Sequence, residues 1–237
     1  MINSIIKNLK TELKKQDRPA NRINYQQFFK EKLKEPTGLR TSILRDISNA
    51  HFRSIDNQSK DNILKICNHL LKDGTRYFRF FAFEWALKVK KDYEKADFKL
   101  FEGWLKKYVN DWGSCDALGT GALGHLVLKY PELSVQTQKW AISKNMWLRR
   151  AAAVSLIVPV RNKLLLDEVF QTADILLTDP EDLVQKGYGW MLKVAGDRFP
   201  DEVYKYVMKN KADMPRTALR YAVEKYPTAK RREVMKK

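Results

Sequence analysis

The stretch "KDNILKICNHLLKD", residues 60–73, has the hydrophobic spacing that decides the fold. Ile63, Ile66 and Leu70 recur at intervals of three and four residues, which places them on one face of a helix. The segments "DEVFQTADILLT" and "DEVYKYVMKN" follow the same spacing, and the alternating runs typical of strands are scarce. The sequence therefore predicts an all-α fold.

Working outward from this stretch, turn-forming residues separate the helical segments at regular distances. The predicted segments between them are about 12–18 residues long, a common length for globular helices. The breaks fall at "DGT" (73–75), "YPEL" (130–133), "TDP" (178–180), "FPDE" (199–202) and "YPT" (226–228).

A weak repeat appears when the residue expected to open each second helix is aligned. These marker residues are spaced 37, 34, 36 and 34 residues apart, and a small or modest residue follows three positions after each. A period of about 35 residues predicts a HEAT-like α-solenoid of antiparallel helix pairs. The alternative is a chance alignment of amphipathic helices. The markers are Arg79, Asp116, Arg150, Lys186 and Arg220, followed by Ala82, Gly119, Ala153, Gly189 and Val223.

Composition indicates a folded protein with a polyanionic partner. The chain has 237 residues, 45 Lys+Arg against 28 Asp+Glu, a net charge of +17 and a pI near 9.7. Such an excess of cations favours nucleic acid as the partner. Apolar runs fall short of a membrane span, and the stretch "MINSIIKNLKTELKKQ" is interpreted as an amphipathic helix rather than a signal peptide. Cys67 and Cys115 give no disulfide framework or zinc motif, so we expect a cytosolic protein.

One acidic residue interrupts the predicted row of cations. In "NDWGSCDALG", residues 110–119, Trp112 and Asp116 stand four residues apart, and Asp116 is the acidic marker among basic ones. A carboxylate in that row would repel phosphates, so it needs a reason. The bland alternative is an N-cap, with a helix beginning at 116 or 117. Trp112 lies among turn-forming residues, which argues against a core position.

Two other segments join tryptophan to unusual neighbours. Trp190 follows Gly187 and Gly189, which cost about 1 kcal/mol each in a helix and therefore indicate close helix packing or close approach of a ligand. In "NMWLRR" the side chains of Arg149 and Arg150 point about 100° apart, so we expect at least one to face solvent or an anion. Tryptophans on apolar stripes are predicted to be core residues: Trp85, Trp104 and Trp140.

Familiar catalytic motifs find little support in the sequence. His51, His69 and His125 are scattered without metal-ligand spacing, and no Walker or GxSxG motif occurs. The glycines of "GTGALG", residues 119–124, lie inside a helical pattern and follow no strand, so they do not form a dinucleotide loop. No metal site and no cofactor are expected.

Three motifs in order resemble the AlkD type of DNA alkylation repair protein, a family of HEAT-like-repeat DNA glycosylases. They are W-x-x-x-D at 112–116 with the following "YPEL", "WLRR" at 147–150 and "QKGYGWML" at 185–192. The resemblance covers nearly the whole chain. It implies a single domain over 1–237, a C-shaped solenoid that holds duplex DNA in a basic concave groove, and Asp116, Trp112 and Trp190 as catalytic residues. Arg150 corresponds to the family's site arginine, and Phe29 stands where its N-terminal helix often carries Tyr.

The resemblance implies hydrolysis of the N-glycosidic bond of cationic N3- or N7-alkylated purines in duplex DNA, without base flipping. A carboxylate would then stabilise the positive sugar that forms, which accounts for an acid on a basic track. We expect a monofunctional, monomeric enzyme without strand-cleaving lyase activity. A non-catalytic DNA-binding solenoid and a protein-interaction scaffold are the alternatives. The residues expected to contact DNA are Arg150, Arg149, Lys186, Trp147, Phe29 and Arg79.

Overall fold

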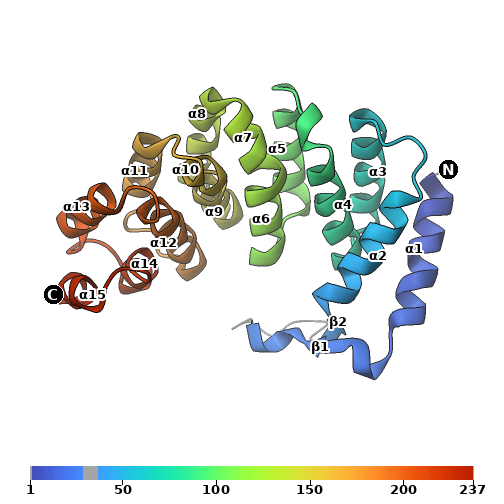
Figure 1. Ribbon diagram of the computed structural model, residues 1–237, viewed down its shortest axis with the longest axis horizontal. Coiled ribbons are helices and arrows are strands. Elements are labelled where there is room, and N and C mark those ends of the chain that lie inside the picture. Colours follow the sequence, from blue (N-terminus) through green and yellow to red (C-terminus); the bar gives the residue numbers. More distant parts are fainter. Residues whose placement is uncertain (1, 29–36, 237) are drawn as a thin grey trace. The chain divides into compact units, whose positions relative to one another are not determined.

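The computed structural model describes residues 2–28 and 37–236 and confirms an all-α protein (Figure 1). The chain divides into two compact units, residues 1–91 and 92–237. The prediction of one domain over 1–237 stays a prediction.

The first unit is built around three long helices that follow an N-terminal helix. Its elements are α1 (Ile2–Gln16), η1 (Pro19–Asn21), β1 (Arg22–Asn24), η2 (Tyr25–Phe28), β2 (Thr37–Leu39), α2 (Thr41–Arg53), α3 (Lys60–Asp73) and α4 (Arg76–Lys88), with η3 (Lys90–Asp92) at its boundary. The helical character predicted for the stretch 60–73 is confirmed by α3, with Ile63, Ile66 and Leu70 fully buried. The predicted amphipathic N-terminal helix is also confirmed as α1, which buries Leu9.

A short antiparallel sheet in the first unit was not predicted. Its register pairs Arg22 with Leu39 and Asn24 with Thr37. The hydroxyl of Tyr25 donates to the Leu39 carbonyl at 2.6 Å, and the Leu39 amide donates to the hydroxyl of Tyr77 at 2.9 Å. Strands of three residues are too short to show a hydrophobic alternation, which explains why the sequence did not reveal them.

The second unit consists mostly of helices shorter than those of the first, although α12 has 15 residues. Its elements are α5 (Asp97–Tyr108), α6 (Trp112–Leu118), a π-helical turn η4 (Gly119–Leu123), α7 (Gly124–Lys129), η5 (Pro131–Leu133), α8 (Ser134–Gln138), η6 (Lys139–Ile142), α9 (Met146–Val154), α10 (Ile157–Arg161), α11 (Leu166–Ile175), α12 (Asp182–Gly196), α13 (Pro200–Asn210), α14 (Arg216–Ala222) and α15 (Thr228–Met235). The "GTGALG" segment lies within helical structure, as predicted.

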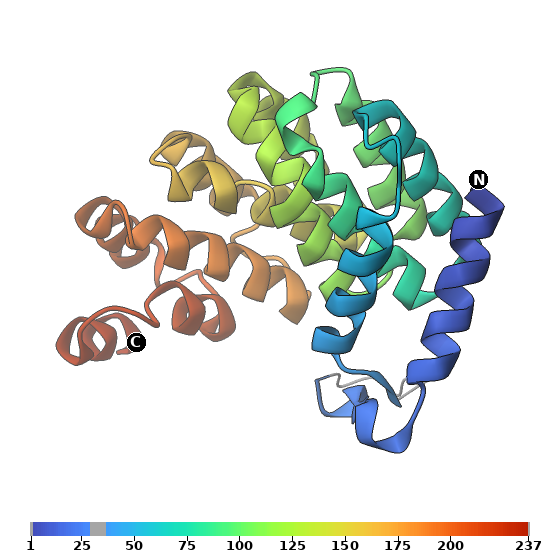
Figure 2. The same cartoon turned by 45° about the vertical axis from the view of Figure 1, so that its right-hand side comes forward.

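The marker residues lie at equivalent places in their helices, which supports the repeat. Each stands three or four residues after the first residue of α4, α6, α9, α12 or α14, so it belongs to the second turn and does not open the helix as predicted. The residue three positions further on is buried in every case. Small residues at this position allow neighbouring helices to approach closely. At Gly189, an added Cβ would lie 2.8 Å from the Ala218 carbonyl oxygen. Accordingly, α12 and α14 lie side by side in both views (Figures 1 and 2).

The tryptophans divide into two groups, and the three that were predicted to be core residues are confirmed as such. Trp85, Trp104 and Trp140 are at most 3% exposed and belong to the core of their units. Trp112, Trp147 and Trp190 are half-buried, so part of each indole remains accessible. The three accessible indoles all belong to the second unit.

Candidate active site

The site begins at the N-terminus of α6, where Asp111 rather than Asp116 is the cap. The Asp111 carboxylate accepts a hydrogen bond from the Ser114 amide at 2.7 Å, and its extended backbone precedes the helix. This is the arrangement of an N-cap, which satisfies an amide that has no partner in the helix. The alternative that Asp116 caps a helix beginning at 116 or 117 is therefore wrong. Asp116 lies in the second turn, on the same face as Trp112 four residues earlier.

The Asp116 carboxylate is held by Arg150 from α9. Nε and Nη2 of Arg150 donate to Oδ1 and Oδ2 of Asp116, each at 2.8 Å. The side chains are 6% exposed for Arg150 and 19% exposed for Asp116. Two parallel hydrogen bonds to one carboxylate fix its orientation, which is the geometry that guanidinium groups favour.

Burial and pairing act in opposite directions on Asp116. Removal from water disfavours the charged form and raises the pKa of the Asp116 carboxyl, while the hydrogen bonds and charge of Arg150 oppose this rise. The same ion pair raises the pKa of Arg150, which stays a cation. The result is an oriented carboxylate that lies in a poorly solvated position and still reaches the surface.

The third guanidinium nitrogen of Arg150 connects this pair to α12. Its Nη1 donates to the carbonyl oxygen of Leu183 in the first turn of α12. Gly187 makes room for the arginine, since an added Cβ there would lie 3.1 Å from Arg150 Cγ. Close packing thus explains both Gly187 and Gly189, one against a side chain and the other against α14.

Arg149 is also paired, and the anion that it faces is a carboxylate of the protein itself. Its Nε donates to Asp179 Oδ2 at 2.6 Å, and its Nη1 donates to the Ser143 carbonyl at 2.9 Å. Arg149 and Asp179 side chains are 15% and 5% exposed. The two arginines point in different directions, as their helical spacing requires, and each direction leads to a carboxylate of the protein. Direct phosphate contacts by Arg149 and Arg150 find no support in this arrangement.

Trp190 and Lys186 lie on successive turns of α12. Lys186 Nζ is 2.8 Å from Asp182 Oδ2, one turn before it, so its charge is partly compensated. Trp190 follows one turn later and is half-buried. Trp147 lies in the first turn of α9, where Asn145 caps the helix by accepting from the Trp147 amide at 2.9 Å.

The remaining predicted contact residues belong to the first unit. Arg79 is half-buried in α4, and Phe29 lies outside the described residues. Among the markers of the second unit, Arg220 is exposed on α14. The row of cations predicted from the markers is therefore partly neutralised in this unit, because Arg150 and Lys186 each have an acidic partner.

Sequence reasoning missed two groups that support the site. Asp179 was noticed only as part of a "TDP" turn, and its buried position opposite Arg149 had no signal in the sequence. The carbonyl of Leu183 is a backbone group, and no residue type marks it.

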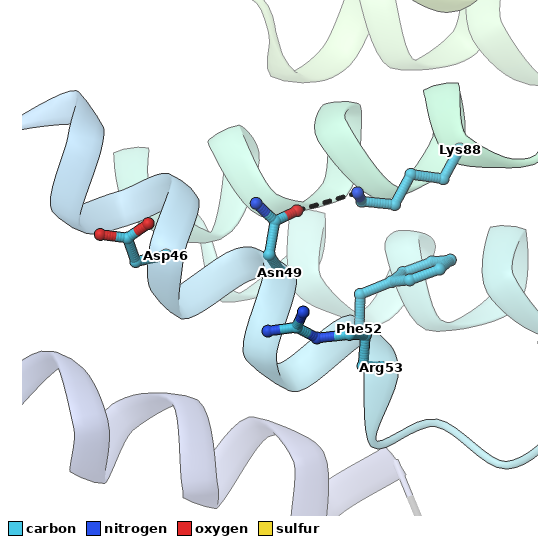
Figure 3. Close-up of a pocket in the computed structure, with 5 residues that line it drawn as sticks. All are labelled: Asp46, Asn49, Phe52, Arg53 and Lys88. Carbon is cyan, nitrogen blue, oxygen red and sulfur yellow. Dashed lines mark hydrogen bonds between the residues drawn. The ribbon is translucent and has the colours of Figure 1, made fainter.

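A separate hollow of about 490 Å³ lies in the first unit between α2 and α4 (Figure 3). Lys88 Nζ donates to Asn49 Oδ1 there at 2.9 Å and lies 5.2 Å from the centre of the Phe52 ring. Asp46 and Arg53 complete its lining. None of the candidate catalytic residues lines this hollow.

Comparisons with known proteins agree with the predicted family. The sequence profile described as "DNA alkylation repair enzyme" matches residues 9–226. A solved structure titled "Predicted DNA alkylation repair enzyme from Enterococcus faecalis" is similar in fold, with a TM-score of 0.70 and 18% sequence identity. The similarity covers 81% of this chain and 88% of that one. None of the curated proteins compared matches this chain.

In the part of the chain that the structure describes, no helix is both long enough and apolar enough to cross a membrane.

Because the profile match covers nearly the whole sequence, the chain belongs to the DNA alkylation repair enzyme family, and its role lies in the repair of alkylated DNA.

Proposed function

We propose that the protein is a monofunctional DNA glycosylase that hydrolyses the N-glycosidic bond of cationic N3- or N7-alkylated purines in duplex DNA. The observation that carries the proposal is the Asp116–Arg150 pair, which presents an oriented, partly exposed carboxylate one turn from the accessible indole of Trp112. Membership of the repair family supplies alkylated DNA as the setting.

The proposed chemistry makes use of a charge that moves during the reaction. An N3- or N7-alkylated purine is a cation, so it leaves as a neutral base and needs no general acid. The positive charge passes to the deoxyribose, which becomes oxocarbenium-like, and water adds to complete hydrolysis. A carboxylate fixed before the reaction stabilises that charge without reorganising, which is the form of electrostatic catalysis with the largest effects.

Arg150 reconciles the carboxylate with a polyanionic partner. An isolated Asp116 would repel the phosphates that the chain's net charge of +17 attracts. Pairing with Arg150 removes most of this repulsion at a distance, because the two charges cancel. At hydrogen-bond range, the exposed edge of the Asp116 carboxylate can still interact with a bound sugar.

The indoles supply flat surfaces for the substrate. Trp112 and Trp190 are half-buried, so each offers part of an aromatic face that attracts cations and packs on deoxyribose. In this proposal the modified base stays in the stack and is not moved into a protein pocket. The second helices of the pairs face the duplex, which they contact chiefly through phosphates.

Incubation with duplex DNA that contains one 7-methylguanine tests the proposal directly. Free base released above the spontaneous rate is expected from the wild type, and an intact strand at the abasic site shows that no lyase step follows. A non-catalytic binding protein would bind the duplex in a salt-dependent manner without releasing base. A protein-interaction scaffold would show neither release nor a salt-dependent affinity for DNA.

A further inference from the structure

The pair formed by Arg149 and Asp179 ties together two segments of the second unit that precede candidate site residues. On its own side, Arg149 Nη1 donates to the carbonyls of Ser143 at 2.9 Å and Lys144 at 3.2 Å, in the turn just before α9. On the other side, Nε and Nη2 of Arg149 donate to Oδ2 and Oδ1 of Asp179, in the turn before α12. Arg149 therefore links the beginnings of two helices.

Asp179 in turn contacts the beginning of α12. Its Oδ1 accepts from the Glu181 amide at 2.9 Å, and its backbone carbonyl accepts from the Gln185 side chain at 2.8 Å. Glu181 is the residue immediately before α12, and Gln185 lies in its first turns. The carboxylate thus fixes where α12 begins, and Arg149 fixes the carboxylate.

The start of α12 also holds Arg150, the partner of Asp116. Arg150 donates to the Leu183 carbonyl, which lies two residues after Glu181. A shift of this first turn would move the acceptor away from Arg150 and loosen the guanidinium that orients Asp116. It would equally rotate Trp190, which lies two turns further along the same helix.

We propose that the Arg149–Asp179 pair is a positioning element, which sets α12 against α9 so that Arg150 keeps Asp116 oriented and Trp190 keeps its place. This inference rests on the proposed glycosylase function. It differs from a direct role for Arg149 in DNA binding, because the guanidinium already donates four hydrogen bonds within the protein. They go to both carboxylate oxygens of Asp179 and to the carbonyls of Ser143 and Lys144.

The two roles make opposite predictions for Asp179→Ala. If Arg149 positions α12, loss of either partner breaks the same link, and the two alanine variants behave alike. If Arg149 contacts phosphate, Asp179→Ala frees its charge for the DNA, so affinity for duplex holds or rises while Arg149→Ala weakens binding. A lost phosphate contact also reduces the salt slope by about one.

The experiment compares Arg149→Ala, Asp179→Ala, the double variant and Arg149→Lys. Lys225→Ala is the control, since it removes a cation from the exposed ion pair with Asp197. Single-turnover release of 7-methylguanine is measured at saturating enzyme, and affinity for undamaged duplex is measured at several salt concentrations.

Each single alanine variant is expected to slow release by about 10- to 100-fold, as small misplacements of catalytic groups do. The affinity and salt slope should match those of the control, and the double variant should be no slower than the slower single variant. Arg149→Lys should recover part of the rate.

A readout that does not depend on activity separates this inference from the proposed function. The pKa of the Asp116 carboxyl is followed by carbon-13 NMR in the wild type and in both alanine variants. We expect it to rise in both, because a loosened Arg150 stabilises the carboxylate less. If the wild type releases no base but this rise occurs, the glycosylase proposal fails and the positioning role stands. Unchanged release together with an unchanged Asp116 pKa would overturn the positioning role. So would a salt slope reduced in Arg149→Ala alone. If an alanine variant does not fold, Arg149→Lys and Asp179→Asn replace it.

Discussion

Arg150 donates hydrogen bonds of 2.8 Å to both carboxylate oxygens of Asp116. Arg150 lies on α9, which begins 34 residues later in the chain than α6, the helix of Asp116. The acid is therefore one half of a largely buried ion pair and not a lone charge among cations. This relationship changes what removal of either residue does, because the partner left behind becomes an unpaired buried charge.

Asp116→Asn should separate catalysis from DNA binding. Asn keeps the size and one acceptor oxygen of the side chain but loses the negative charge. Release of 7-methylguanine from duplex DNA is expected to fall by roughly 10²–10³-fold, the scale of one lost preorganised electrostatic group. Affinity for undamaged duplex should hold or rise, since Arg150 is then uncompensated. A release rate equal to that of the wild type, after subtraction of spontaneous depurination, would remove Asp116 from the active site.

Stability measurements on both partners should reveal strong coupling. Asp116→Asn and Arg150→Met each leave an uncompensated charge in a poorly solvated place, so each should lower the free energy of unfolding by about 3–5 kcal/mol. The double variant should cost less than the sum of the two, with an interaction of roughly 0.5–3 kcal/mol. Urea unfolding of the four proteins measures this difference. Additive losses would show that the two side chains do not form a pair in solution.

The accessible and the buried tryptophans should respond differently to truncation. Trp104→Ala removes a core side chain that is 2% exposed and should cost about 3–5 kcal/mol of stability. Trp112→Ala and Trp190→Ala should cost clearly less and should slow base release instead. Thermal melts together with release assays check this expectation. A loss of stability as large as that of Trp104→Ala would assign the affected indole to the core.

The acidic side of the pH–rate profile should belong to Asp116. Only the ionised carboxylate stabilises a cationic sugar, and burial raises the pKa of this group above that of an ordinary aspartate. As the pH falls, release should therefore decline before an exposed aspartate, with a pKa of about 3.9, would become protonated. Single-turnover rates between about pH 4 and about pH 7 measure the decline. Asp116→Asn should show no such decline in its residual rate, and a decline that survives the substitution would point to another group.

Two glycines make a matched test of the packing around Arg150. An added Cβ at Gly187 would lie 3.1 Å from Arg150 Cγ, whereas at Gly103 on α5 it would have no neighbour within 4 Å. Gly187→Ala should displace the arginine and slow release. Gly103→Ala should leave release unchanged and raise stability by about 0.5–1 kcal/mol, because alanine loses less entropy in a helix. Equal rates in the two variants would show that the site tolerates movement of Arg150.

The sequence predicted those parts of the structure that depend on repeated local patterns. Helical spacing located α3, and the surroundings of the tryptophans separated the buried Trp85 from the accessible Trp112. The small residues after the markers foretold close helix packing, as Gly189 shows. These features follow from which residues recur at a fixed interval along one chain segment, and such intervals are visible in the sequence itself.

Pairing between segments could not be predicted in the same way. Because Arg149 and Arg150 are adjacent on a helix, their side chains must point in different directions. The sequence does not show that Arg149 reaches Asp179 and that Arg150 reaches Asp116. Ordinary preferences favour exposed arginines, and only the packing of α9 against α6 and α12 overrides them. The cap at Asp111 was missed for a smaller reason, since helix ends are the least certain part of any prediction from a single sequence.

The placement of Asp116 and Arg150 on neighbouring repeats has a consequence for protein engineering. A module cut at the natural period would carry either the acid or its guanidinium, but not both, and the third contact of Arg150 requires the opening turn of the next module as well. The smallest transplantable cassette therefore extends from α6 to α12. Inserting or deleting one module inside that cassette would disconnect the carboxylate from its partner, while additions outside it would lengthen the scaffold and leave the ion pair intact.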